Sequence, residues 1–146
     1  MQTIEQVLPP FLTNDFIGTR KPIINGHGSN SRAAINATAT ATAAQVATGY
    51  ITSTSAAATS ITLPTGTLLG AYLGAEQGDT FDLFIDNTAG SNTVTIVAAV
   101  NGILSALAAA EAGGSGLLTV PNGVTGQACF RIMFSSGTAY TFTRIA

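Results

Sequence analysis

The stretch GDTFDLFIDNTAGSNTVTIV, residues 78–97, limits the possible folds of this 146-residue chain more than any other part. From Phe81 to Ile85, apolar side chains occupy every second position, which is the period of a half-buried β-strand. The alternation returns from Val94 to Ile96, and the Asn, Gly and Ser residues between the two runs are typical of a turn. The stretch therefore predicts two strands joined as a β-hairpin, and with them a mainly β fold.

Further β runs lie on both sides of this stretch. Two short candidates, Val46–Thr52 and Thr59–Leu63, precede it, and Leu117–Val120 follows it. The clearest alternation in the chain covers Gln127–Phe134, and Tyr140–Ile145 then returns as the last strand of a C-terminal hairpin. These short strands, divided by Gly, Asn and Pro turns, predict an all-β fold with minor α, an antiparallel β-sandwich or jelly-roll-like module.

A short helix is predicted after Thr65 or Thr67, because either side chain can cap its start. Leucine and tyrosine recur along it at spacings of three and four residues until Gly74, which suits its end. This helix would act as a lid over one end of the sandwich. Residues 104–112 also have a helical composition, although sheet context would draw residues 103–107 into a strand.

Residues 1–44 are expected to form an extended arm and linker ahead of a β-sandwich body at residues 45–146. Three prolines and isolated bulky side chains fall in the arm without a helical or strand period. Residues 33–48 are low-complexity Ala and Thr, and their β-branched Thr residues favour extended chain. A free arm would not usually expose so many large apolar groups. We expect it to dock on a neighbouring subunit or a larger scaffold, the alternative being that it covers its own domain.

Charged residues make up only 8% of the chain, against roughly 25% in ordinary soluble proteins. Either hydroxyls and amides solvate the surface, or much of it is buried against copies or a partner, and we favour burial. Direct nucleic-acid binding is not expected, since only the adjacent Arg20 and Lys21 approach a basic cluster. No window reaches the roughly 18 apolar residues of a membrane span, and the start lacks a basic secretory signal, so synthesis in a cytoplasm is expected.

Neither a catalytic centre nor a cofactor is expected. His27 is the only histidine and Cys129 the only cysteine, which excludes an intrachain disulfide and the usual zinc ligand sets within one chain. Three copies of His27 at a trimer axis could bind a metal, but a loop histidine beside glycines is more often solvated. Cys129 falls in an alternating strand and is expected to be an inert packing residue.

Three aspartates cluster in the central stretch. Asp82 and Asp86 share one face of the predicted strand and Asp79 lies at its start, which is not the ligand spacing of a calcium loop. The simpler interpretation is that Asp79 and Asp86 make the turns before and after the strand. Arg131 is expected to pair with Asp82 or with a carboxylate of a neighbouring subunit.

Three segments carry a resemblance to a known class of protein: SITLPTGTLLGAYLGAEQ, GDTFDLFIDNTAGSNTVTIV and ACFRIMFSSGTAYTFTRIA. Together they resemble a domain that recurs in virion proteins of tailed phages, especially capsid decoration (cement) and head-fibre proteins. The likeness covers roughly residues 48–146 and rests on Gly, Asp, aromatic and Thr positions. It implies a trimeric β module on a virion surface.

The resulting hypothesis is a structural virion protein made in the host cytoplasm. As a homotrimer it would bind the major capsid protein on the outer surface of the head and reinforce it through many weak contacts. A closed ring would also hide sheet edges that few charges are available to shield. The candidate capsid contacts, chosen from composition as the arm's large apolar anchors and paired cations, are Phe11, Phe16, Arg20 and Lys21.

Two alternatives stay open. A head-fibre or tail-fibre module that binds a host receptor or glycan would need exposed aromatics such as Tyr50, Tyr72 or Tyr140 to line a groove, and the absence of tryptophan weakens it. A small β-fold enzyme assembled at trimer interfaces would need a carboxylate pair such as Asp82 and Asp86, and no substrate suggests itself.

Overall fold

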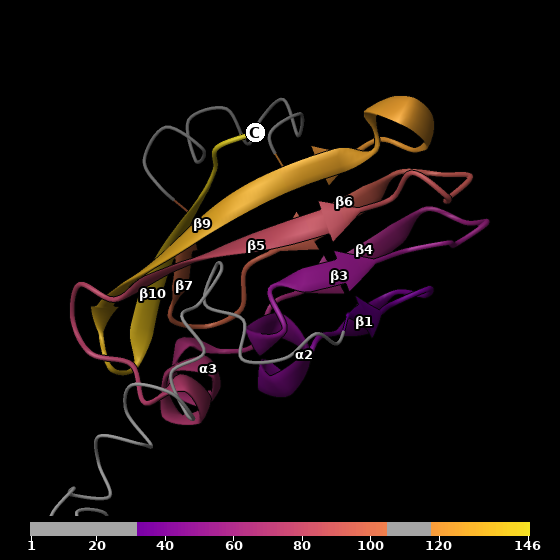
Figure 1. Ribbon diagram of the computed structural model, residues 1–146. Helices are drawn as coiled ribbons and strands as arrows, with labels where there is room; N and C mark the ends of the chain where they lie inside the picture. Colours follow the sequence, from indigo (N-terminus) through magenta and orange to yellow (C-terminus); the bar gives the residue numbers. More distant parts are fainter. Residues whose placement is uncertain (1–31, 105–117) are drawn as a thin grey trace, which may run out of the picture.

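Two packed β-sheets form the body of the protein, and α2 and α3 lie together on one side of it (Figure 1). The computed structural model describes residues 32–104 and 118–146. The strand order is β1-β3-β5-β9-β10-β7 in the six-stranded sheet and β2-β4-β6-β8 in the four-stranded sheet. The predicted all-β class with minor α is confirmed. The pairing is mixed, however, since both sheets contain parallel and antiparallel neighbours.

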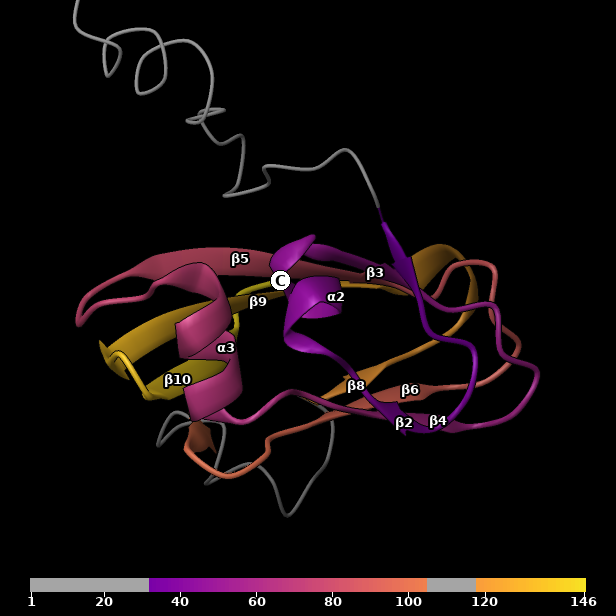
Figure 2. The ribbon, with the colours of Figure 1, turned by 90° about the horizontal axis from the view of Figure 1, so that it is seen from below.

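In the first half of the body the chain winds through three successive coils, each of which places one strand in the six-stranded sheet and the next strand in the four-stranded sheet. The chain changes sheet after each strand, so three parallel strands stack in either sheet (Figure 2). In the six-stranded sheet these are β1 (Ala33–Ala34), β3 (Tyr50–Thr52) and β5 (Thr80–Asp86). In the four-stranded sheet they are β2 (Ala39–Thr40), β4 (Thr59–Thr62) and β6 (Val94–Val97). Ile51 and Ile85 are register partners on one inner face, as are Ile61 and Ile96 on the other, and all four are buried.

The predicted hairpin across residues 78–97 is wrong. β5 pairs with β3 and β9, whereas β6 pairs with β4 and β8, so the two strands belong to different sheets. The connection between them crosses the edge of the sandwich and is anchored by the buried Asn87. Its side-chain Nδ2 donates to the carbonyl oxygens of Asn92 and Val120 at 2.8 and 3.1 Å. Alternation correctly indicated the buried face of each strand. The buried faces of β5 and β6, however, lie on opposite sides of the core, one in each sheet.

The second half of the body adds four more strands, of which β8 and β9 pair antiparallel with strands of the coils and β7 pairs parallel with β10. The bounds are β7 (Gly102–Leu104), β8 (Thr119–Val120), β9 (Gln127–Ser136) and β10 (Ala139–Arg144). β9 and β10 form the predicted C-terminal hairpin, and β9 also pairs antiparallel with β5. Their inward rings pack at centroid distances of 6.0 Å, Phe130 on Phe142 and Phe134 on Tyr140. These four rings fill one end of the core, which rigidly supports the outer face of the six-stranded sheet.

The helix predicted after Thr65 or Thr67 is confirmed as α3 (Gly66–Leu73), and the first of these two candidate caps starts it. The Thr65 side chain accepts a hydrogen bond from the Leu68 backbone N–H, and Gly74 ends the helix with the left-handed conformation that suits glycine. Gly70 lies against the β9–β10 turn, where an added Cβ would overlap the carbonyl oxygen of Gly137. The absence of a side chain at Gly70 therefore allows α3 to pack closely on the turn.

The predicted linker belongs in part to the folded body. Residues 33–40 contribute β1 and β2, and Ala33, Ile35 and Ala41 are buried in the core. The strand predicted from Val46 is wrong in its first half, because a capping box at Thr42 starts α2 (Ala43–Ala47). The body thus begins about a dozen residues before the predicted boundary at residue 45. Small Ala and Thr side chains suit these edge strands, and composition alone did not separate them from a linker.

Candidate functional site

Two neighbouring rows of side chains cross β3, β5 and β9 on the outer face of the six-stranded sheet. They come from the positions that alternate with the buried Ile51 and Ile85, so they point away from the core. The strand register defines the rows as Tyr50, Phe84 and Cys129 in the first and Thr52, Asp86 and Gln127 in the second. Aromatic and polar groups are thereby held side by side on a rigid support.

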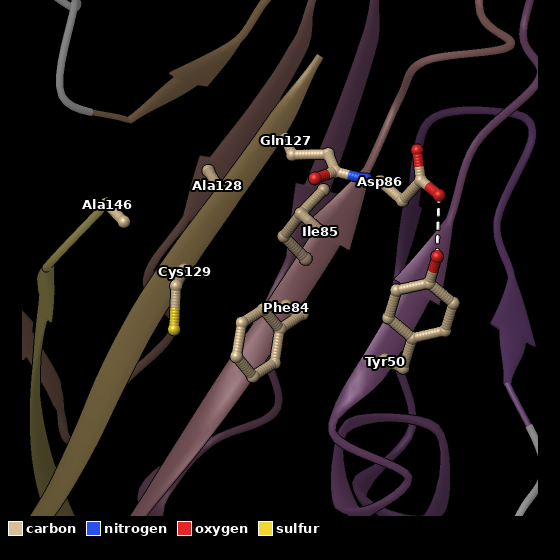
Figure 3. A pocket seen from close by; sticks show the side chains of 8 residues that line it. All are labelled: Tyr50, Phe84, Ile85, Asp86, Gln127, Ala128, Cys129 and Ala146. Carbon is tan, nitrogen blue, oxygen red and sulfur yellow. Dashed lines mark hydrogen bonds between the residues drawn. The ribbon is translucent and has the colours of Figure 1, made fainter. Parts of the chain in front are cut away.

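A pocket of about 170 Å³ opens over these rows, and Figure 3 shows the side chains that line it. The Phe84 ring lies between Tyr50 and Cys129, with 36% of the residue exposed. The chain's last residues form the far wall, because the Cys129 N–H donates to the Ala146 carbonyl at 2.8 Å and the Ile145 N–H donates to the Cys129 carbonyl at 2.8 Å. We call this site the Tyr50–Phe84 pocket.

The carboxylate of Asp86 is held in place at the edge of the Tyr50–Phe84 pocket. The Tyr50 hydroxyl donates to Asp86 Oδ2 at 2.6 Å, and the backbone N–H and Oγ1 of Thr88 donate to Oδ1 at 2.9 and 2.7 Å. These bonds, that from Tyr50 first, lower the pKa of Asp86, and the same bond to Asp86 together with burial raises the pKa of Tyr50. At neutral pH the site therefore presents a carboxylate and a protonated phenol whose oxygen can still accept.

A positive charge lies beside this pair. Arg32 directly precedes Ala33, whose register partner is Ile51, so the backbone of Arg32 lies next to that of Tyr50. The charge of Arg32 contributes to the low pKa of Asp86 and partly offsets the raised pKa of Tyr50. The carboxylate of Asp86, which lines the Tyr50–Phe84 pocket, is thus under the influence of the positive charge of Arg32.

Cys129 is buried, in agreement with its predicted packing role. Its burial, followed by the nearby charge of Asp82, raises the pKa of the thiol. The thiol is therefore protonated at neutral pH, and this form is a poor nucleophile. Cys129 contributes shape to the pocket wall.

The predicted pairing of Arg131 with Asp82 is confirmed one step further along the same face. The two residues are register partners in β9 and β5, and Nε and Nη2 of Arg131 donate to the two carboxylate oxygens of Asp82, each at 2.8 Å. Asp79 accepts from the Glu76 backbone N–H at 2.9 Å, as expected of a turn residue. Within residues 32–104 and 118–146, no group of three or more His, Cys, Asp or Glu could hold a metal ion.

A second concave surface, the α3 groove, has a different chemistry. It has a volume of about 610 Å³ and lies between α3 and the segment that joins β2 to α2. The exposed fractions of Leu68 and Tyr72 are 60% and 59%. The residues along it, none of them charged, are Thr40, Ala41, Thr42, Ala43, Pro64, Thr65, Leu68, Ala71, Tyr72 and Ala99.

The structure separates the aromatic residues that the sequence proposed for a groove. Tyr50 lines the Tyr50–Phe84 pocket and Tyr72 lines the α3 groove. Tyr140 cannot line either, because it is fully buried and its hydroxyl donates to the Pro64 carbonyl at 2.8 Å. Its environment, an apolar core, raises the pKa of the phenol. The candidate capsid contacts lie outside the described residues: Phe11, Phe16, Arg20 and Lys21.

Sequence reasoning missed Phe84 and Gln127 as pocket residues. A signal for Phe84 was present, because it is a large apolar residue on the face of TFDLFID that otherwise carries Thr and Asp. Gln127 had no such signal, since it adjoins Asp86 only through the antiparallel pairing of β9 with β5.

A scan of protein-family models, a search of curated proteins and a search of solved structures each return no significant match. In the described part of the chain, neither α2 nor α3 has the length and apolarity needed to cross a membrane.

Proposed function

We propose that this chain is a structural protein of a tailed-phage virion, a decoration protein that binds the outer surface of the head as a homotrimer and stabilises it. The observation that carries the proposal is the α3 groove, where Leu68 and Tyr72 are more than half exposed in surroundings without charge. Such surfaces are typical of protein contacts, and the chain's 8% of charged residues provides little to oppose association.

The proposed mechanism is physical reinforcement. Each copy would contribute the α3 groove to contacts within the trimer, and the arm to contacts with the major capsid protein. β1, the first described strand, lies at the edge of the six-stranded sheet, so capsid contacts made by residues before it would not require a change in the core. Three linked arms multiply individually weak contacts, and the trimer then holds neighbouring capsid subunits together against the pressure of packaged DNA.

The test combines mass in solution with binding to heads. Light scattering of the full chain should give about three times 14.7 kDa. A Phe11→Ala/Phe16→Ala variant should keep that mass but lose co-sedimentation with cognate heads that lack the decoration protein. Val124→Ala, at a fully exposed position of the body, is the matched control. A monomeric full chain would refute the trimer, and head binding that survives the arm substitutions would refute the arm's assignment.

The receptor- or glycan-binding module is the second candidate, and the Tyr50–Phe84 pocket is the observation that favours it. The enzyme alternative has no comparable support. Asp82 and Asp86 share one face as predicted, but Asp82 is paired with Arg131 while Asp86 is held by Tyr50 and Thr88.

A further inference from the structure

We propose that the Tyr50–Phe84 pocket is a carbohydrate site that binds one neutral hexopyranose unit, as found in a cell-surface polysaccharide. This site shares no lining residue with the α3 groove, so the inference does not depend on the contact proposed for that groove. The inference follows from the pocket's ring surface, its hydrogen-bonding groups, its charges and its size.

The ring surface comes first. Phe84 projects from the solvent-facing side of β5 with 36% of its surface exposed, and the Tyr50 ring stands beside it on β3 (Figure 3). An exposed Phe next to a half-buried Tyr offers an apolar ring surface beside the polar row of Thr52, Asp86 and Gln127. The C–H face of a sugar ring is also flat and apolar, and burying it there removes both surfaces from water.

The hydrogen-bonding groups around the patch are mainly acceptors. Asp86 Oδ1 already accepts two bonds from Thr88, whereas Oδ2 accepts one from Tyr50 and has room for another donor. The Tyr50 hydroxyl donates its proton to Asp86, so its oxygen can accept. The Gln127 amide, in the row of Asp86, supplies both a donor and an acceptor. Several acceptors and one amide match adjacent hydroxyl groups, each of which donates and accepts.

The charges favour a neutral ligand. The ionised Asp86 lines the pocket and repels an acidic sugar, and the charge of Arg32, which acts on both Tyr50 and Asp86, offsets part of the attraction of Asp86 for a cation.

The size limits the ligand to a single ring. The pocket's volume of about 170 Å³ is below the roughly 300–1,000 Å³ of sites for drug-sized ligands. One sugar unit bound in a partly open pocket should have a dissociation constant on the order of 1 mM or weaker. A polysaccharide that displays many copies of the unit would bind more tightly to an assembly than to one chain.

The experiment is saturation-transfer NMR of the full chain with methyl α- and β-glycosides of glucose, galactose and mannose. At least one should receive saturation on its ring protons. Phe84→Ala should weaken its binding about tenfold or more, and Gln127→Ala several-fold. The controls are Met133→Ala, half exposed on the same face of β9, and Tyr72→Ala in the α3 groove, and both should bind as the parent does. Amide spectra verify that each variant is folded.

Three outcomes would overturn the inference. One is that none of the six glycosides shows saturation transfer at tens of millimolar. Another is that binding is equal in the parent and in both folded pocket variants. The third is that methyl glucuronide or tetramethylammonium binds better than every neutral glycoside, which would assign the pocket to a charged ligand.

Discussion

The Tyr50–Phe84 pocket and the α3 groove are both concave, yet they differ in size, chemistry and support. The pocket, about 170 Å³, lies on three paired strands and has a carboxylate fixed by three hydrogen bonds. The groove, about 610 Å³, lies where the chain passes between the sheets and is lined without charge. Fixed polar groups select a small ligand by its hydroxyl pattern, whereas an open apolar surface suits a broad protein contact. One small body thus offers two surfaces suited to different partners.

The largest expected effect is a loss of self-association when charges are placed in the α3 groove and the Tyr50–Phe84 pocket is left unchanged. Leu68→Asp/Tyr72→Asp places two carboxylates in the α3 groove and should weaken self-association by about 100-fold or more, because burying unpaired charges is costly. Dilution series by light scattering would measure the change, with Val124→Asp as the control at a fully exposed position. Glycoside binding in the pocket should be unaffected. A variant that keeps the parent's mass at all concentrations would show that the groove is not the subunit contact.

A smaller effect is expected from the support of the α3 groove. Gly70→Ala inserts a methyl group against the carbonyl oxygen of Gly137 and should lower the free energy of unfolding by about 1–3 kcal/mol. Urea denaturation would measure it, with Thr67→Ala on the exposed side of α3 as the control. Amide shifts should change around α3 and leave the Tyr50–Phe84 pocket unaltered. Equal stability of both variants would mean that α3 does not depend on this close packing.

The next effect is a loss of stability in acid that depends on Asp86 in the pocket. The pKa of Asp86 is lowered on folding, so its stabilising contribution is complete above the ordinary value of about 4 and is lost as the pH falls through the folded value. Asp86→Asn should therefore lose less stability than the parent between about pH 5 and pH 2. In the same variant the pKa of Tyr50 should fall towards its ordinary value, since the bond to Asp86 is the main cause of its rise. Denaturation at each pH and tyrosine ring shifts would measure both, and identical acid profiles would contradict the prediction.

The smallest effect is expected from the ion pair of Arg131 and Asp82, which lies next to the pocket on the same face of the sheet. Arg131→Ala removes the bonds to Asp82 and should lower the free energy of unfolding only slightly, because the Arg131 side chain is 49% exposed. The loss should shrink further in high salt, which thermal unfolding at two ionic strengths would reveal. Arg131→Lys is the control that retains the charge. A loss larger than that of Gly70→Ala would mean that this pair, not the core rings, supports the outer face.

Several features could be predicted from the sequence because their causes are local. Thr65 and Gly74 bound α3 as expected from capping preferences, and the alternation in β9 and the turn after it specify the C-terminal hairpin. The pairing of Asp82 with Arg131 followed from their positions on alternating strands. The Tyr50–Phe84 pocket could not be predicted, because it requires β3, β5 and β9 to be neighbours although they are distant in the sequence.

The sequence by itself determined the strands within residues 50–63, 80–97 and 119–144, the side of each that faces the core, and the end of α3 at Gly74. These are properties of neighbouring residues: backbone preference, capping and alternating polarity. The tertiary structure alone decided that β5 and β6 belong to different sheets and that Ala33–Thr40 forms two edge strands of the body. Alternation specifies a buried face and not a partner, and parallel coils are selected only when the inner faces of both sheets meet over one core.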